Sequence, residues 1–549
     1  MTSITRAEGY VSMQVDTIVR GGIVIDGTGS PRLPSDVAIA DGRVVALGDI
    51  PGFRAHDEID ATGCIVSPGF INVLSHAYYT LQQDPRGLSD LYQGVTTQVF
   101  GEGVSLGPVE GQMTTEMIWL GDAPSGVQQA WPRLRQFLSD LEERGVGQNV
   151  ASFVGAANLR MSAVGLDDRR LTSEELARAA ELLHRELSEG ALGVGSALIY
   201  PPGSYADTDE LTAYCRVVAH HDGLHISHIR NEGDRLIEAV DELIHIARAS
   251  GSRAEIYHLK TAGRQNWPKM TQVIERIESA RKTGVEITAD IYPYVAGGTA
   301  LSASIPPQFH LGGITELRQL LRDDAGRDAI AKAIAAGGDW ESLWRMSGGA
   351  EGVVLLSHHP ELGITAGMSV ADIARQRGDA DPVMTMLDVV DAAPTADAAY
   401  FIGSEEAIKL AFERPWVSVC SDSDAPSAEQ QFADHPVHPR AYGAFARVLG
   451  RYAREESIVT MEDAIHRMTG HAAATLRLPD RGVLRPGAHA DIAVFDPDTI
   501  VDESTYQEPA QYARGMRHVL VNGTCALRDG VPTGCLAGQA LRRAGSPHV

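Results

Sequence analysis

Two histidines in the middle of the chain each close a short apolar run, His228 at the end of GLHISH and His258 at the end of AEIYH. A helical pattern separates the runs, as between consecutive strands of a β/α barrel, and such strand ends aim two neutral imidazoles at one metal ion. A third apolar run, residues 415–420, is followed by Asp422. A carboxylate there would act as the catalytic base beside a metal-bound water, so the pattern favours an enzyme.

The elements that must position these residues alternate along the chain. SEELARAAELLHRELSEG and DRLIEAVDELIHIARASG carry apolar residues at three- and four-residue spacing, which predicts amphipathic helices between the apolar strands. Strand and helix alternating over several hundred residues predict an α/β fold of parallel units, and eight strands would close a (β/α)8 TIM-like barrel. The candidate strands are residues 65–73, 96–100, 191–196, 223–227, 254–257, 286–291, 352–356 and 416–420.

Both ends of the chain are typical of small β units. Residues 16–50 carry β-branched runs broken by glycine turns, and the C-terminal part repeats this pattern with a hairpin turn at the Asn522-Gly523 pair. Residues 300–350 add helix between two strands, as either an ordinary long barrel connection or an inserted lid, and we favour the lid. The predicted domains are a β-sandwich (1–67 together with 476–549), the barrel (68–299 and 351–475) and the inserted helical segment (300–350).

Composition limits the partners. Of 549 residues, 47 are basic and 72 acidic, and this net charge of -25 argues against a nucleic-acid or anionic-membrane surface and favours a small-molecule partner. No apolar stretch approaches the roughly 20 residues of a membrane span. The first residues lack the order of a secretory signal, so we expect a cytoplasmic protein. Five cysteines without a CxxC pair indicate reduced thiols. The sequence does not set the number of subunits, so a homo-oligomer is one of the possible assemblies.

Several strings occur in an order that carries a resemblance: SPGFINVLSH, YQGVTTQVFGEG, HISHIRNEGDR, ADIYPY, VCSDSDAP and LRPGAHADIAVFDP. With them the chain resembles the amidohydrolase superfamily and, within it, the D-aminoacylase (N-acyl-D-amino-acid deacylase) family, over nearly its whole length. The resemblance implies a metal-dependent β/α barrel, a β-sandwich built from both termini and a small mobile insertion. It also implies hydrolysis of the amide bond of an N-acyl-D-amino acid or a related small N-acyl compound.

The resemblance implies His228 and His258 as zinc ligands. Glu102, in the string GEG after the second strand, stands where many relatives have another anionic ligand, and a carboxylate can bind zinc. Its other interpretation is a solvated loop acid. Asp422 matches the residue that takes a proton from the hydrolytic water and later delivers one to the leaving nitrogen, with metal-bound hydroxide as the nucleophile. Asp424 is near enough to compete with it.

The first strand departs from the family. Where relatives have His-x-His, this chain has Leu74, Ser75 and His76. Leucine cannot bind a metal, so we expect a second metal position to be largely lost. We therefore expect one zinc ion, or another divalent metal, held by Glu102, His228 and His258 with one position open for water. His76 either hydrogen-bonds the water or substrate or packs beneath the metal.

Other residues are predicted to bind substrate. Lys260 and Tyr292 match the family's carboxylate-binding positions, and residues two apart on a strand lie on one side, so Lys260 would share a side with His258. A structural ion pair is the alternative for Lys260. Tyr200 is a candidate donor to the oxyanion. Arg230 would hold substrate or form a structural ion pair.

Other functions remain open. The same fold would support hydrolysis of a different amide or a cyclic imide, or a non-hydrolytic elimination. The loss of a histidine at Leu74 also motivates a catalytically silent barrel used for binding.

Overall fold

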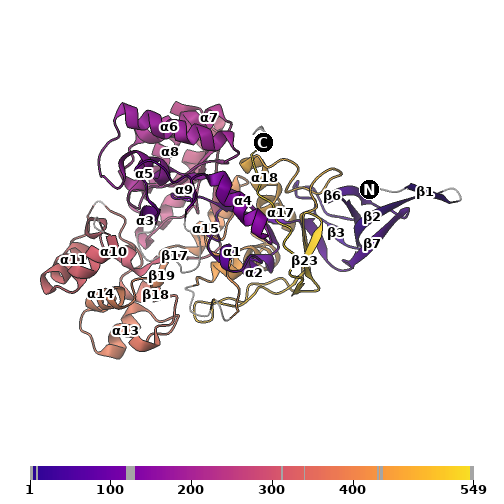
Figure 1. Ribbon diagram of the computed structural model, residues 1–549. Coiled ribbons are helices and arrows are strands. Elements are labelled where there is room, and N and C mark those ends of the chain that lie inside the picture. The colour runs from indigo at the N-terminus through magenta and orange to yellow at the C-terminus, as the bar shows by residue number, and fades with distance from the viewer. Residues whose placement is uncertain are drawn as a thin grey trace.

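The computed structural model describes residues 4–7, 10–118, 130–310, 313–338, 340–429, 432 and 437–543. The predicted sandwich segments also include residues 1–3, 8, 9 and 544–549, and the predicted insertion includes residues 311, 312 and 339, which lie outside the described residues. The fold is mixed α/β, with N- and C-terminal strands on one side and a group of helices on the other (Figure 1). Within these ranges we find no helix whose length and apolar character would let it cross a bilayer.

Parallel strands form the centre of the molecule. One sheet has the order β11-β10-β9 and the other β12-β13-β14-β15-β16-β20. The chain passes from the first sheet to the second through Phe153, which separates β11 from β12. At the far edges, the Asp422 amide donates to the carbonyl of Leu74 (3.0 Å). The strands are β9 (Phe70–Asn72), β10 (Val95–Phe100), β11 (Asn149–Ser152), β12 (Val154–Gly155), β13 (Gly193–Ala197), β14 (Leu224–His228), β15 (Arg253–Ile256), β16 (Ile287–Ile291) and β20 (Val417–Val419).

Amphipathic helices connect the strands and cover them. In α8, between β14 and β15, Leu236, Val240, Leu243 and Ala247 are buried at three- and four-residue spacing. Because each connection returns the chain to the same end of the sheet, the carboxyl ends of the strands meet at one edge. The main covering helices are α4 (Leu134–Arg144), α5 (Ala156–Val164), α6 (Ser173–Ser188), α7 (Thr208–His220), α8 (Leu236–Ser250), α9 (Met270–Lys282), α15 (Glu405–Phe412), α16 (Arg440–Arg447), α17 (Met461–Met468) and α18 (Gly470–Leu476).

One predicted barrel strand is wrong. The run at 352–356 forms β18 (Val353–Leu355), which pairs antiparallel with β19 (Asp397–Phe401) in a separate sheet that also holds β17 (Ala296–Ala300). A buried apolar run looks the same in either kind of sheet, so its pattern could not reveal the partner. The parallel set instead includes β11, which begins with the buried Asn149 and lacks the long apolar run that is typical of a buried strand.

Strands from both ends of the chain share a sheet. β8 (Ile65–Pro68) pairs antiparallel with β21 (Ile492–Phe495), and Figure 1 shows the indigo β3 and the yellow β23 in the same region. A second sheet faces this one across an apolar cluster that contains Val19, Ile39 and Val494. The two sheets comprise β1 (Ile4–Ala7), β2 (Tyr10–Arg20), β5 (Asp36–Ala40), β6 (Arg43–Gly48) and β7 (Phe53–Asp60), and β24 (Val531–Pro532), β23 (Thr524–Arg528), β22 (Met516–Val521), β21, β8, β3 (Ile23–Val24) and β4 (Leu33–Pro34).

A helical unit projects beside the parallel strands, at the lower left of Figure 1. It follows β17 and packs around an apolar cluster that includes Leu301, Ile330, Val389 and Ile402. This unit therefore has a core of its own. Its helices are α10 (Gly313–Leu321), α11 (Asp324–Ala336), α12 (Leu343–Met346), α13 (Val370–Arg377) and α14 (Pro382–Ala392).

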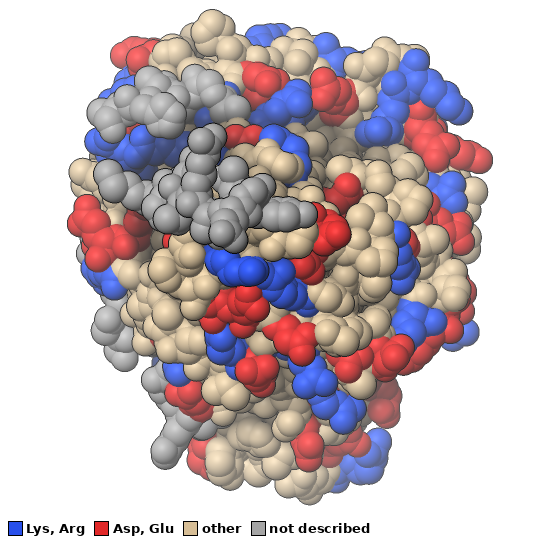
Figure 2. Space-filling model, turned by 90° about the vertical axis from the view of Figure 1, so that its right-hand side faces the viewer, with Lys and Arg blue, Asp and Glu red and all other residues tan. Residues whose placement is uncertain are grey.

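Charged residues on the face drawn in Figure 2 are mixed. Basic and acidic side chains alternate there over short distances. Such mixing of signs is typical of a solvated surface, and it gives this face no broad field that would attract a polyanion.

A buried amide fastens the C-terminal part of the chain to the parallel strands. Asn149, fully buried at the start of β11, donates to the carboxylate of Asp491 (3.2 and 3.3 Å). Its side-chain oxygen accepts hydrogen bonds from the side chain of Asn522 (2.8 Å) and the amide of Gln539 (3.1 Å). Three segments that are distant in sequence therefore depend on one side chain.

We predict that Asn149→Ala lowers the free energy of unfolding by about 1–3 kcal/mol, because it leaves buried polar groups without partners. The urea midpoint of unfolding would measure this change. The exposed Gln136 on α4 provides the control, and Gln136→Ala should change stability by less than about 0.5 kcal/mol. Equal midpoints for the two variants would contradict the role of Asn149.

Candidate metal centre and active site

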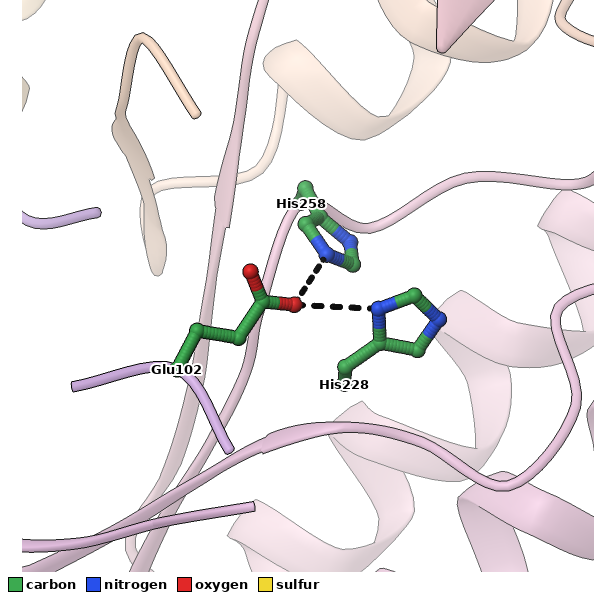
Figure 3. A group of neighbouring side chains, drawn as sticks. All are labelled: Glu102, His228 and His258. Carbon is green, nitrogen blue, oxygen red and sulfur yellow. Dashed lines mark hydrogen bonds and ion pairs between the residues drawn. The ribbon is translucent and has the colours of Figure 1, made fainter. Parts of the chain in front are cut away.

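Three predicted residues converge at the carboxyl edge of the parallel strands. Glu102 follows β10, His228 ends β14 and His258 follows β15. Oε1 of Glu102 lies 3.0 Å from Nδ1 of His228 and 3.0 Å from Nε2 of His258, as Figure 3 shows. The side chains are almost completely buried, with 9%, 7% and 2% of their surfaces exposed. Residues as much as 156 positions apart thus point their donor atoms at one spot.

The arrangement of these donors fits a metal ion. Each residue offers one ligand atom, and the three atoms lie within 4.8 Å of one another. Ligands at about 2.0–2.1 Å from a tetrahedral zinc ion would be separated by roughly 3.3 Å, close to the observed contacts. Burial raises the pKa of the Glu102 carboxyl group, but His258 and hydrogen bonds from both imidazoles outweigh it and hold that pKa well below its usual range. Glu102 is therefore an anionic donor.

A second carboxylate lies behind the two imidazoles. Oε1 of Glu232 is 3.0 Å from Nδ1 of His258, and Oε2 is 3.7 Å from Nε2 of His228. Only the contact with His258 is short enough for a hydrogen bond, and Nε2 of His228 has no hydrogen-bond partner among the described residues. A carboxylate behind a metal-binding imidazole orients the ring when it accepts the N–H of the nitrogen that faces away from the metal. Lys260 also contacts Glu232, at 2.9 Å, and Nδ1 of His258, at 2.6 Å. Despite burial, Lys260 and the two histidines hold the pKa of Glu232 far below its usual range.

His76 and Asp422 lie on the other side of Glu102. Nε2 of His76 is 3.2 Å from Oε2 of Glu102 and 3.1 Å from Oδ1 of Asp422. These three residues form a second group whose donor atoms converge, and the group shares Glu102 with the first. Leu74 itself is buried in the core. A second cluster of three donors is therefore present although position 74 is a leucine. His76 lies in the site and not in the apolar core.

The carboxylate of Asp422 is held by Arg440. Nη1 of Arg440, the first residue of α16, donates to Oδ2 of Asp422 at 2.6 Å, and Nη2 donates to the carbonyl of Gly298 at 3.2 Å. Burial raises the pKa of Asp422, yet Arg440, His258 and the hydrogen bond with His76 together lower it below the usual value. Asp422 is ionised at neutral pH, as a proton acceptor must be.

The backbone is strained at two of these positions. His258 (φ 35°) and Asp422 (φ 49°) adopt left-handed conformations, which are uncommon for residues other than glycine. Hydrogen bonds hold both residues there: the amide of His258 donates to Asp290 (2.7 Å), and the amide of Asp422 donates to the carbonyl of Leu74 (3.0 Å). Strain of this kind costs about 1–3 kcal/mol and clusters at functional sites.

A cavity of 1550 Å³ lies between the helical unit and the segments that follow β13 and β14. Its lining includes Tyr200, Arg230, Thr299 and Glu341. The ring of Tyr200 lies 5.7 Å from the ring of His228, at an angle of 71°, so one wall of the cavity lies next to His228. The Tyr200 hydroxyl pairs with the side chain of Thr299, although burial dominates and raises its pKa. The cavity is large enough for a small-molecule ligand.

The remaining predicted substrate residues have partners within the protein. Arg230 donates to the carboxylate of Glu242 (2.9 and 3.0 Å) and to the carbonyls of Ser204 and Ala206. Of the two interpretations given for Arg230, these contacts match the structural ion pair. The ring of Tyr292 lies 5.6 Å from Nζ of Lys260 and 4.7 Å from Cζ of Arg440. These two cationic side chains flank one ring at the edge of the site.

Sequence reasoning missed or underrated three site residues. Glu232 and Arg440 lie four and 18 positions after His228 and Asp422, and no local pattern in the sequence shows which side chains they contact. Glu341 lies outside every motif of the sequence, so nothing in its neighbourhood predicts a place in the site. The competing carboxylate of Asp424 belongs to neither group of converging donors.

Comparisons with known proteins agree with this geometry. A family model described as the amidohydrolase family matches residues 315–526. Over 545 residues the chain is 34% identical to an N-acyl-D-glutamate deacylase of Alcaligenes xylosoxydans xylosoxydans, which covers 97% of this chain and 99% of that protein. It is also 31% identical over 533 residues to a D-aminoacylase of the same organism, with 97% and 98% covered.

A solved structure is similar over the same extent. It is that of an N-acyl-D-glutamate deacylase from Bordetella bronchiseptica, complexed with zinc and a phosphonate inhibitor that mimics the reaction tetrahedral intermediate. It matches with a TM-score of 0.78 and 33% identity, covering 96% of this chain and 100% of that chain. The resemblance predicted from the sequence is confirmed: the chain belongs to the amidohydrolase family, in the group of N-acyl-D-amino-acid deacylases that includes D-aminoacylase.

Proposed function

We propose that this protein is a metal-dependent hydrolase that cleaves the amide bond of N-acyl-D-amino acids. The observation that carries the proposal is the convergence of Glu102, His228 and His258 on one point, with the ionised Asp422 joined to Glu102 through His76. The relatives named above act on N-acyl-D-amino acids, and one of them was solved with zinc. Both facts support the same reaction class.

We assign the metal to Glu102, His228 and His258, and propose one zinc ion. Glu232 would orient the imidazole of His258 from behind, through the ring nitrogen that faces away from Glu102. When bound, a divalent ion would polarise the scissile carbonyl and lower the pKa of water to about 7. The second group, with His76 and Asp422, offers the place where a further ion would bind.

Asp422 would act as the general base and then as the general acid. Its ionised carboxylate accepts a proton from the attacking water and delivers it to the nitrogen that leaves when the C–N bond breaks. The hydrogen bond from Arg440 keeps the carboxylate ionised and fixes its direction. Tyr200, beside His228 at the mouth of the cavity, is the candidate hydrogen-bond donor to the oxyanion.

Lys260 and Tyr292 would bind the substrate carboxylate. Lys260 and Arg440 bring two positive charges to the ring of Tyr292, which favours an anionic group there. In the unliganded protein Glu232 pairs with Lys260, so a substrate carboxylate would share that ammonium group.

We further propose that the parallel strands form the closed (β/α)8 barrel. Counting β11 and β12 as one strand, the two sheets contribute eight, and the hydrogen bond between Asp422 and Leu74 supports closure. The sheets from both termini would form the sandwich (1–67 with 476–549), and the barrel would comprise residues 68–299 and the part of 351–475 that follows the inserted unit. The insertion would begin at residue 300 and include 300–350. Its apolar cluster continues to Ile402, which favours a larger inserted unit.

Metal content tests the assignment directly. We expect purified protein to hold about one divalent ion per chain, and His228→Ala and His258→Ala to lower metal content to a small fraction of that. Elemental analysis after gel filtration measures this. The exposed His358 lies outside both groups, so His358→Ala should retain the metal. Active protein without any bound ion would refute the proposal.

Asp422→Asn removes the proton acceptor and keeps the size of the side chain. We expect kcat to fall by at least about 100-fold while the metal content stays the same, since general acid–base catalysis contributes factors of this order. Asp424→Asn should keep most of the activity. If the two effects were exchanged, Asp424 would be the catalytic residue. A binding protein without catalysis would show no change in rate for either.

A substrate panel separates the reaction classes. We expect N-acetyl-D-amino acids to be hydrolysed, with their L enantiomers, unrelated linear amides and cyclic imides much slower, because the substrate carboxylate and the scissile carbonyl are each held at a fixed place. Release of free amino acid measures the rates. Faster turnover of a cyclic imide, or a product formed without uptake of water, would favour the corresponding alternative.

A further inference from the structure

One acid of the inserted unit reaches the back of the candidate metal site. Oε2 of Glu341, just before α12, accepts a hydrogen bond from the backbone amide of Glu232 at 2.9 Å. The carboxylate of Glu232 in turn lies 3.0 Å from His258. Glu341 is therefore separated from a candidate metal ligand by a single residue, although it lies 83 positions further along the chain than His258.

The other oxygen of Glu341 has no hydrogen-bond partner among the described residues. Among the cavity-lining side chains that the structure describes, Oε1 of Glu341 is the buried polar atom without a hydrogen bond. Buried carboxylate oxygens are normally paired, because an unpaired one loses its hydration without compensation. Burial and the neighbouring carboxylate of Glu232 raise the pKa of Glu341 to about 8, although Lys260 and His258 act in the opposite direction, so Glu341 is largely protonated at pH 7 in the unliganded protein.

Three arginines of the cavity wall have acidic partners. Arg230 is held by Glu242 at 2.9 and 3.0 Å. Arg318 and Arg322 both contact Asp391, at 3.3 and 3.1 Å, and their side chains are 38% and 61% exposed. Solvent therefore screens the positive charge at the outer wall, whereas the carboxyl group of Glu341 lies at the buried inner wall, where an approaching cation would lower its pKa and favour the carboxylate.

We propose that this cavity takes the side chain of the N-acyl-D-amino acid and that Glu341 binds a cationic group at its end. The preferred substrates would then carry an ammonium or guanidinium group, as in N-acyl-D-lysine or N-acyl-D-arginine. This inference rests on the proposed deacylase function and specifies its substrate class. It also separates this protein from its relative that acts on N-acyl-D-glutamate, because a side-chain carboxylate would meet the carboxyl group of Glu341.

A matched pair of substrates tests the role of Glu341. N-acetyl-D-lysine and N-acetyl-D-norleucine have side chains of the same carbon number and differ in the terminal ammonium group. For the wild-type protein we expect kcat/KM to be at least about tenfold higher for the lysine substrate, the factor typical of one charge-assisted contact. N-acetyl-D-glutamate should be the poorest of the three.

Glu341→Gln keeps the size of the side chain and removes the carboxylate that a bound cation would stabilise. We expect it to lower kcat/KM for N-acetyl-D-lysine until the ratio to norleucine approaches one, with little change for norleucine. The control is Glu238→Gln, at an exposed acid on α8 that lines the same cavity. This control should leave the lysine-to-norleucine ratio as in the wild type, because removing a negative charge elsewhere in the cavity does not remove the group proposed to bind the ammonium.

The outcomes are separable. No turnover of any N-acetyl-D-amino acid would refute the proposed function itself. Turnover of norleucine without a preference for lysine, or a ratio that Glu341→Gln leaves unchanged, would refute the role of Glu341 alone. If Glu341→Gln also lost activity on norleucine or melted at a lower temperature, Glu341→Asp, which shortens the reach by one methylene, would replace it. A lysine-to-norleucine ratio that Glu341→Asp leaves unchanged would overturn the proposal.

Discussion

The contact of the Glu102 carboxylate with two imidazoles is the interaction on which the site depends. Burying an isolated carboxylate is costly, and the cost is offset only when positive or hydrogen-bonding groups surround it. Here His228 and His258 each approach the same oxygen to 3.0 Å. That approach requires β14 and β15 to be neighbours in a parallel sheet, so that both histidines leave the same edge. The fold therefore serves to hold three donors at one point.

Charges alternate outward from this point. The histidines contact Glu232, Glu232 pairs with Lys260, and the backbone of Glu232 is tied to Glu341 of the inserted unit. Each negative group close to the site has a positive or hydrogen-bonding neighbour, which is how a cluster of ionisable residues remains stable when buried. Through this chain of contacts the inserted unit touches the surroundings of the metal site, and a change at the cavity wall can affect the chemistry.

The first strand illustrates how a lost ligand need not disturb the architecture. Leu74 cannot bind a metal, but its carbonyl accepts the amide of Asp422 and holds that residue in its left-handed conformation. His76, two residues later, still reaches Glu102 and Asp422. The backbone of this strand thus helps to position the proposed base, while the side chain of Leu74 packs in the core.

The sequence alone predicted that His228, His258, Glu102 and Asp422 belong to one site, because each follows a short buried run within a motif of the family. The order of these motifs along the chain also indicated the family. It could not assign the strand at 353–355 to its sheet, since apolar runs look alike whichever partner they pair with. Nor could it reveal the contacts of Arg440 with Asp422 or of Glu341 with Glu232. These contacts join residues 18 and 109 positions apart, and only the packing of the helices and of the inserted unit against the strand ends decides which charges meet.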